Sequence, residues 1–354
     1  MGMTNFELKK GKTSFIAEIG PNHDGNLNIA LELVRKVAAA GADAVKFQTY
    51  SAAGTVVSQN APLADYMKTA GDWSDQGLLL ESVRLTQSDF VKISRVCEEE
   101  CIAFLSTPFD CPSVDFLLEL GMSAIKVPSG EITNPFLIRC VAKTGLPLIV
   151  STGMATCDDI SWCLNEIRSV WAQADLKVGE DPITLLHCTS AYPTAAQDTN
   201  LLAMDLLREE FDVPIGFSDH TIGMVAPLAA AAKGAVVVEK HISYNPKASG
   251  PDHAASLSVD DLPDLISSIR EIETVLGMKQ KKPVNQEKNV ALVARRSLVA
   301  AREIEAGEIY SWENLSALRP QTGVPAQMAS ELIGRKAARF YQRDEMIDVC
   351  EIEA

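Results

Sequence analysis

The chain has 354 residues and a formal net charge of −15 at pH 7, with 47% hydrophobic and 22% charged residues. This is the balance of a folded globular protein, and it argues against binding to nucleic acid and to anionic membrane surfaces. No apolar run approaches the roughly 20 residues that span a bilayer, and the amino terminus lacks an apolar signal core, so we expect a cytoplasmic protein.

Short apolar runs alternate with helical segments through most of the chain. Eight runs are continuously apolar, as strands buried on both faces are. In chain order these runs are Ser14–Ile19, Ala44–Gln48, Ile102–Ser106, Ala124–Val127, Leu146–Ser151, Ile183–Cys188, Pro214–Phe217 and Ala235–Glu239. Helical periodicity follows each run, in Leu27–Ala40, Gln87–Cys101, Ser113–Leu120, Pro135–Thr144, Asp158–Gln173, Leu201–Phe211, Met224–Lys233 and Leu262–Leu276.

Eight strand–helix repeats over about 280 residues predict an α/β fold, a (β/α)₈ TIM barrel spanning residues 1–279. A doubly wound open sheet is the alternative. It usually has fewer strands and a G-x-G-x-x-G turn after the first, and the turn at Gly20–Gly25 does not match that pattern.

One connection is much longer than the others. Thr49–Leu85 contains Gly54, Gly71 and Gly77 and shows little periodicity. Long loops in compact domains are usually lids or binding loops, so we favour a lid on the catalytic face over a plain insertion.

The pattern changes after the barrel. Residues 280–293 are polar and basic and are predicted to be a linker. Residues 294–354 contain the short β-like runs Ser297–Ala301 and Ile347–Ile352, which predict a small β-rich module. A module of this size is marginally stable alone, so we expect it to pack on the barrel or on a second subunit.

Polar side chains end several predicted strands, and in a barrel these ends meet at one opening. Lys46 and Lys126 lie in apolar strands, where an ammonium must be paired or meet an anionic ligand. With the hydroxyls of Thr107, Ser129 and Ser151 they suit a phosphate or carboxylate. The alternative is that each lysine pairs with an internal acid, Glu18 or Glu131, and binds nothing.

Two histidines follow the seventh and eighth strands. His220 and His241 lie one βα repeat apart, which places their side chains next to each other. They are either interior histidines with hydrogen-bond partners or ligands of a divalent metal. Water and substrate oxygens would complete such a metal site, which suits a Lewis acid acting on a carbonyl.

These residues belong to a series of motifs that resembles the sialic acid (N-acetylneuraminate, or nonulosonate) synthase family. The motifs are A-E-I-G-x-N-H at Ala17–His23, V-K-F-Q at Val45–Gln48, S-T-P-F at Ser106–Phe109, K-V-P-S-G-E at Lys126–Glu131, S-T-G-M at Ser151–Met154, H-C-T-S-x-Y-P at His187–Pro193, G-x-S-D-H-T at Gly216–Thr221, E-K-H at Glu239–His241, G-P-D at Gly250–Asp252 and R-P at Arg319–Pro320. The tail resembles the antifreeze-like SAF (β-clip) domain of those enzymes.

The resemblance implies condensation of phosphoenolpyruvate with an N-acetylated hexosamine, N-acetylmannosamine or a related 2,4-diacetamido sugar, to give a nine-carbon nonulosonic acid and phosphate. It implies catalytic roles for Glu18, Lys46, Lys126 and Glu131. It places phosphoenolpyruvate at Lys46, Thr107, Lys126, Ser129, Ser151, Ser190 and Ser218, and the sugar at Gln48, Tyr192, Glu239, Asp252 and Arg319. His220 and His241 match the ligands of Mn²⁺ or Mg²⁺. Arg319 matches a residue that the SAF domain lends to the partner's site in a domain-swapped homodimer.

Three alternatives stay open. One is a synthase of 3-deoxy-octulosonate or heptulosonate phosphate, which uses the same chemistry but usually lacks a SAF-like tail. A second is an aldolase with a Schiff base on Lys46 or Lys126. The third is an inactive barrel whose tail binds carbohydrate or ice.

Overall fold

The computed structural model describes residues 4–179 and 182–353 and divides the chain into two compact units, the first ending at Gly277 and the second beginning at Met278. The first unit is built on eight parallel strands. These are β1 Ser14–Glu18, β2 Ala44–Thr49, β3 Ala103–Pro108, β4 Ile125–Val127, β5 Leu148–Ser151, β6 Ile183–His187, β7 Ile215–Asp219 and β8 Val237–Ser243. They pair in the order β3-β2-β1-β8-β7-β6-β5-β4, and β3 lies beside β4, so the ring nearly closes. The short strand β9, Leu257–Ser258, extends from β8. The predicted TIM barrel is confirmed.

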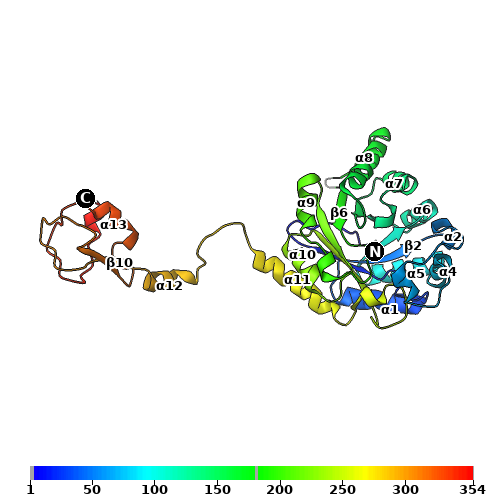
Figure 1. Cartoon of the computed structure of the whole chain (residues 1–354), viewed down its shortest axis with the longest axis horizontal. Helices are drawn as coiled ribbons and strands as arrows, with labels where there is room; N and C mark the ends of the chain where they lie inside the picture. Colours follow the sequence, from blue (N-terminus) through cyan, green and yellow to red (C-terminus); the bar gives the residue numbers. More distant parts are fainter. Residues whose placement is uncertain (1–3, 180–181, 354) are drawn as a thin grey trace. The chain divides into compact units, whose positions relative to one another are not determined.

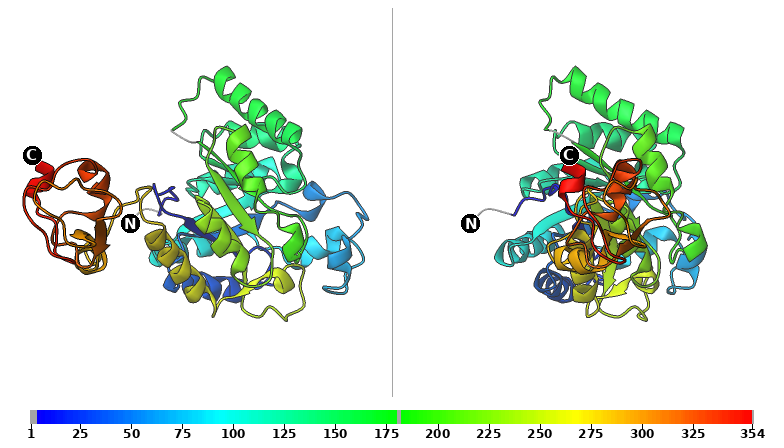
Figure 2. Two further views of the ribbon diagram at one scale, coloured as in Figure 1. Left: turned by 60° about the vertical axis from the view of Figure 1, so that its left-hand side comes forward. Right: turned by 90° about the vertical axis from the view of Figure 1, so that its left-hand side faces the viewer.

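Helices surround these strands on the outside (Figures 1 and 2). The main ones are α1 Leu27–Ala39, α5 Gln87–Glu99, α6 Cys111–Glu119, α7 Pro135–Ala142, α8 Cys157–Gln173, α9 Ala203–Glu210, α10 Val225–Ala232 and α11 Leu262–Leu276. Local signals fix their starts: Thr86 and Thr156 form capping boxes with Asp89 and Asp159. The strands are buried along almost their whole length because helices cover one face and the barrel interior fills the other. This explains the continuous apolar runs in the sequence.

The long connection after β2 is not a simple coil. It folds into three short helices, α2 Ala53–Val56, α3 Asp65–Lys68 and α4 Gln76–Ser82. The carbonyl of Ala70, between α3 and α4, accepts hydrogen bonds from the backbone N–H of Gly250 at 2.9 Å and from Ser249 Oγ at 2.7 Å. The connection is therefore fastened by its main chain to the segment that follows β8.

The second unit contains one small antiparallel sheet. Strand β10, Ser297–Ala300, pairs with β11, Leu315–Leu318, and isolated bridges join Val299 to Met346 and Ile304 to Tyr341. Its apolar core includes Leu298, Leu332 and Ile347. Its described part also contains the α-helices α12 Glu287–Ala294, α13 Ala329–Leu332 and α14 Cys350–Glu353 and the 3-10 turn Ala326–Met328.

Two details of this unit differ from the sequence prediction. The run Ile347–Ile352 was predicted to be β-like, but the chain turns into α14 at Cys350. That helical turn brings the Glu351 carboxylate to the hydroxyl of Tyr341, which donates to it at 2.8 Å. Most of helix α12 lies within the range 280–293 that was predicted to be a linker.

Candidate active site

A small cavity lies where the carboxyl ends of the barrel strands meet. Its volume is about 60 Å³. Its wall is built by residues from the ends of all eight strands: Glu18, Lys46, Gln48, Thr107, Phe109, Lys126, Pro128, Ser129, Ser151, Cys188, Tyr192, Ser218, His220 and Glu239. The barrel thus brings together most of the residues that the sequence singled out.

Lys46 lies on one side of this cavity with three oxygen partners. Glu18 and Lys46 are register neighbours on β1 and β2, so their side chains point the same way. Lys46 Nζ lies 2.7 Å from Glu18 Oε2 and donates to Thr107 Oγ1 at 3.0 Å. It is also 3.7 Å from Glu239 Oε2.

Lys126 lies on the same side and shares Glu239 with Lys46. Its Nζ donates to Ser151 Oγ at 2.6 Å and lies 3.7 Å from Glu239 Oε1. Glu239 also accepts a hydrogen bond from Ser218 Oγ at 3.0 Å. We call the group of Glu18, Lys46, Thr107, Lys126 and Ser151 the lysine side of the cavity. Both lysines therefore pair with internal acids, but the acid beside Lys126 is Glu239 rather than Glu131.

Burial and close charges separate the acidities of the two carboxyl groups. Burial raises the pKa of Glu18 to about 7, with Lys46 opposing the shift and Glu239 adding to it. Burial acts the same way on Glu239, but the ammonium groups of Lys126 and Lys46 outweigh it and lower the pKa of Glu239. Burial lowers the pKa of Lys126, and Glu239 opposes that shift. Glu239 therefore remains ionised, whereas Glu18 exchanges a proton near neutrality.

Two imidazoles, those of His220 and His241, lie next to each other beside Tyr192, with ring centroids 5.7 Å apart. His220 Nδ1 lies 2.6 Å from the carbonyl oxygen of Thr189. A carbonyl only accepts, so Nδ1 carries the proton and Nε2 presents its lone pair. His241 Nδ1 is buried without a hydrogen-bond partner and lies 3.7 Å from Asp252 Oδ2. Burial lowers the pKa of both histidines, so both rings are neutral at pH 7.

Neutral, paired imidazoles are competent metal ligands, and the carbonyl of Thr189 accepts the Nδ1 proton of His220 and so orients that ring. Within residues 4–179 and 182–353, no three His, Cys, Asp or Glu side chains form a metal-binding group. The donor set fits a divalent metal held by two histidines, with substrate and water oxygens as the other ligands.

Tyr192 forms the wall between this cavity and an outer pocket. Its ring lies 4.2 Å from that of His220 and stacks on Tyr66 at 5.2 Å. We call Tyr192, His220, His241 and Asp252 the histidine side of the cavity; Tyr192 and His220 line it, whereas His241 and Asp252 adjoin them without lining it. Burial raises the pKa of Asp252 to about 6, so this carboxyl is also poised near neutrality.

The outer pocket, of about 620 Å³, lies between the long connection and the segment after β8. It is lined by Tyr66, Lys68, Thr69, Ala70, Gly71, Asp72, Tyr192, Pro193, Pro246, Lys247, Ala248, Ser249, Gly250, Pro251 and Ala254. It is thus continuous with the wall of the inner cavity at Tyr192 and is built in part by the segment predicted to be a lid.

Four of the predicted site residues form hydrogen bonds with other side chains. Ser129 and Ser190 are hydrogen-bonded to each other at 3.0 Å, and Gln48 Nε2 donates to Glu18 Oε1 at 3.2 Å. Glu131 lies in the short turn after β4, accepts from Asn134 at 2.6 Å, and is not part of the cavity wall.

Arg319 belongs to the second unit, after β11. Its side chain is exposed, and the described part of the chain gives it no ion pair or hydrogen bond. It is therefore free to contact another group.

Sequence reasoning missed the network that holds Asp252. The next residue, His253, is fully buried, and its Nε2 lies 2.9 Å from Asp24 Oδ1 while its Nδ1 lies 2.7 Å from Ser243 Oγ. Gly250 has a φ of +153°, and a Cβ there would lie 2.4 Å from His253. The sequence signal that could have revealed this network is the histidine that directly follows the G-P-D motif.

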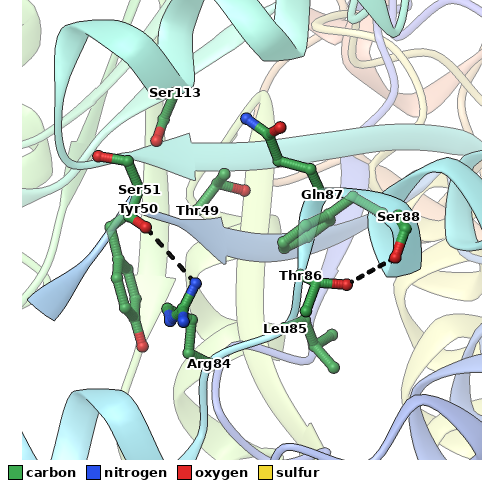
Figure 3. A pocket seen from close by; sticks show the side chains of 10 residues that line it. Thr49, Tyr50, Ser51, Arg84, Leu85, Thr86, Gln87, Ser88 and Ser113 are labelled. Atoms are coloured by element: carbon green, nitrogen blue, oxygen red, sulfur yellow. Dashed lines mark hydrogen bonds between the residues drawn. The ribbon is translucent and has the colours of Figure 1, made fainter.

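A third hollow lies at the base of the long connection, apart from the strand-end cluster. Figure 3 shows Arg84 reaching toward Ser51, whose carbonyl accepts from it at 3.5 Å. Arg84 also pairs with Glu81 at 2.7 Å, and Ser51 donates to Asp110. Arg84 thus joins the two ends of the connection to each other, and Ser51 fastens the first end to the barrel at Asp110.

No helix within the described residues is long and apolar enough to cross a membrane.

The NeuB family model matches residues 33–281, and the SAF domain model matches residues 295–348. The N,N'-diacetyllegionaminic acid synthase of Legionella pneumophila is 41% identical over 91% of this chain and 89% of its own length. The enzyme of the same name from Campylobacter jejuni is 41% identical over 95% of this chain and 99% of its own. A crystal structure of N-acetylneuraminic acid synthetase from Leptospira borgpetersenii superposes with a TM-score of 0.69, at 29% identity over 82% of this chain and 94% of that one.

Proposed function

The chain belongs to the NeuB family, and we propose that it condenses phosphoenolpyruvate with an N-acetylated hexosamine to form a nine-carbon nonulosonic acid and phosphate. The observation that carries this proposal is that two buried lysines and the neutral imidazole of His220 line one cavity, with the second neutral imidazole, that of His241, 5.7 Å from the first. The lysine side suits an anion, and the histidine side suits a metal that polarises a carbonyl.

We place phosphoenolpyruvate on the lysine side. Lys46 and Lys126 neutralise its phosphate and carboxylate, and the hydroxyls of Thr107, Ser129, Ser151 and Ser218 donate to them. In the free protein these lysines contact Glu18 and Glu239. Binding of the anion therefore gives each ammonium group a new, close partner and loosens its contact with the carboxylate.

His220 and His241 would hold the divalent metal, Mn²⁺ or Mg²⁺. When bound, the metal supplies a Lewis acid for the aldehyde oxygen of the open-chain sugar. The histidine rings present their lone pairs, and Tyr192 and Asp252 orient the sugar beside them.

The chemistry forms one carbon–carbon bond and breaks one carbon–oxygen bond. C3 of phosphoenolpyruvate attacks C1 of the sugar, whose oxygen takes up a proton. Water adds to C2 and loses a proton, and the hemiketal phosphate then expels inorganic phosphate. Glu18 lines the cavity with a pKa of about 7, which suits it to accept the proton of the water. Glu131 lies outside the wall and is the weaker choice.

The relatives' names favour a 2,4-diacetamido hexose as the sugar. The outer pocket beyond Tyr192 supports this choice because it offers room for the carbons furthest from C1.

Arg319 acts in the partner's site of a domain-swapped homodimer, which its exposed and unpaired side chain allows. Mixing a His241→Ala subunit with an Arg319→Ala subunit should restore activity, because one complete site forms in the mixed dimer. No restoration would contradict the swap.

Phosphate release tests the function directly. The protein is incubated with phosphoenolpyruvate, Mn²⁺ and one sugar from a panel, with an EDTA control. The panel contains 2,4-diacetamido-2,4,6-trideoxyhexoses, N-acetylmannosamine, its 6-phosphate, and arabinose 5-phosphate. We expect the highest kcat/KM with a diacetamido sugar. Release with arabinose 5-phosphate alone would favour the octulosonate alternative, and a pyruvate adduct trapped by borohydride would favour the aldolase.

A further inference from the structure

A buried ion pair lies behind the two histidines, outside the cavity. Asp219 and Lys240 are both 0% exposed, and Lys240 Nζ lies 2.5 Å from Asp219 Oδ2. The two residues are register neighbours on β7 and β8. Because side chains alternate along a strand, Lys240 points away from the cavity that Glu239 lines. Neither member of the pair has a part in the proposed chemistry.

The ammonium of Lys240 is tied to both neighbours of His220. Besides Asp219 it donates to the carbonyl oxygen of Thr221 at 2.7 Å. The backbone N–H of Thr221 in turn donates to Asp219 Oδ1 at 2.9 Å. Lys240 directly precedes His241 in the chain. Its side chain therefore connects Asp219 and Thr221, the residues on either side of His220, to the backbone next to His241.

Stability alone does not account for such a pair. Removing two charges from water is costly, and a buried ion pair can often be replaced by apolar side chains with no loss of stability. Geometric specificity is a role that buried polar and ionic groups fill in some proteins. Here the geometry that the pair controls is the separation of two neighbouring strand ends.

The two rings differ in how they are held. His220 has its own support from the Thr189 carbonyl and the stacked ring of Tyr192. His241 Nδ1 has no hydrogen-bond partner. The placement of the His241 ring therefore depends more on the backbone of β8, where Lys240 acts.

We propose that Lys240 and Asp219 are positioning residues that fix the separation of the His220 and His241 rings and thereby set the affinity of the site for its divalent metal. The proposal rests on the proposed function of the two histidines. Groups behind the ligands of a metal commonly change its affinity by about 10- to 100-fold when they are replaced.

The test is the double variant Asp219→Asn/Lys240→Met. It removes both charges together, so no single charge is left buried, and Asn retains an oxygen for the N–H of Thr221. Binding of Mn²⁺ is measured from the electron paramagnetic resonance signal of the free ion, and thermal unfolding is recorded on the same samples. We expect Kd for Mn²⁺ to rise about 10- to 100-fold. Phosphoenolpyruvate binding measured by calorimetry without metal should stay within about threefold, because Lys46 and Lys126 are on other strands.

The matched control is Arg270→Met. Arg270 pairs with Asp43 at 2.8 Å and donates to the carbonyl of Thr13, before β1, so it lies at the opposite end of the barrel. Its replacement should lower the unfolding temperature and leave the Mn²⁺ affinity unchanged. An equal loss of Mn²⁺ affinity in this control would overturn the positioning role.

Two further outcomes separate this inference from the proposed function. Wild-type affinity in the double variant would overturn the inference and leave the metal site intact, whereas absence of Mn²⁺ binding by the wild-type protein would overturn the metal site itself. If the double variant does not fold, Asp219→Glu retains both charges and displaces the ammonium by about one methylene. Unchanged Mn²⁺ affinity in that variant would also overturn the inference, and a loss would support it.

Discussion

The lysine side and the histidine side of the cavity are prepared for their ligands in opposite ways. Both ammonium groups on the lysine side already contact carboxylate and hydroxyl oxygens. On the histidine side, His241 Nδ1 has no hydrogen-bond partner, and the Asp252 carboxyl has a pKa raised to about 6 by burial. In the proposed function an anion must therefore exchange partners with the protein, whereas a metal and a sugar would add partners that the histidine side lacks. We expect the two sides to respond differently to substitution.

The largest effect is expected from His241→Ala. Loss of the metal ligand should reduce phosphate release about 10³-fold, since Lewis-acid stabilisation is worth several kcal/mol. Calorimetry should still detect phosphoenolpyruvate binding without metal, because the lysine side is intact. Loss of that binding would show that the two sides are not separate.

Lys126→Met tests the other side. It removes the cation that Ser151 and Glu239 share and leaves Glu239 with one ammonium fewer, so kcat/KM for phosphoenolpyruvate should fall about 10²- to 10³-fold. Mn²⁺ affinity should change less than threefold. A larger loss of Mn²⁺ affinity than of phosphoenolpyruvate affinity would contradict the assignment of the sides.

Glu18→Gln should cost about 10²-fold in kcat, the lower end for loss of a general base. Wild-type kcat/KM should rise with pH up to about 7 and then level, because only the ionised carboxylate accepts a proton and burial raises its pKa to about 7. The variant should lack this rise. Protonation of the histidines gives a separate limb below their ordinary pKa of 6.5, since burial lowers their pKa values.

Glu131→Gln is the matched control for that experiment. Its carboxylate accepts from Asn134 outside the cavity wall, so activity within about threefold of wild type and an unchanged pH profile are expected. If this variant instead lost the rise of kcat/KM with pH, the proton transfer would be assigned to Glu131.

The smallest effect concerns the outer pocket. Tyr66→Leu removes the ring that stacks on Tyr192, a contact worth about 0.5–1.5 kcal/mol. KM for a diacetamido sugar should rise about 2- to 10-fold, with KM for phosphoenolpyruvate unchanged. If N-acetylmannosamine and the diacetamido sugar lost affinity equally, the pocket would not distinguish them.

The sequence predicted the structure best for strands that are buried along their whole length. The runs around Lys46 and Lys126 predicted strands because parallel strands covered on both faces are apolar throughout, so a lysine in them stands out. Helix starts such as Thr86 and Thr156 carry local capping signals. For these elements, neighbouring residues decide the structure.

The remaining features depend on contacts between distant residues. Asp24 meets His253 across 229 positions, and no local pattern announces that contact. Glu131 follows the same strand as Lys126, yet the turn after Val127 directs it to Asn134. Ile347–Ile352 has the composition of a strand, but Glu351 reaches Tyr341 only from a helical turn.

The fastening of the long connection at Ala70 bears on how such an enzyme can diversify. Both hydrogen bonds from the 249–250 segment end on a backbone carbonyl, which every residue type possesses. Mutations that change side chains around the outer pocket, other than at Ser249 and Gly250, can therefore accumulate without releasing the anchor. Preference among sugars can drift in this part of the chain while the strand ends that perform the chemistry stay as they are.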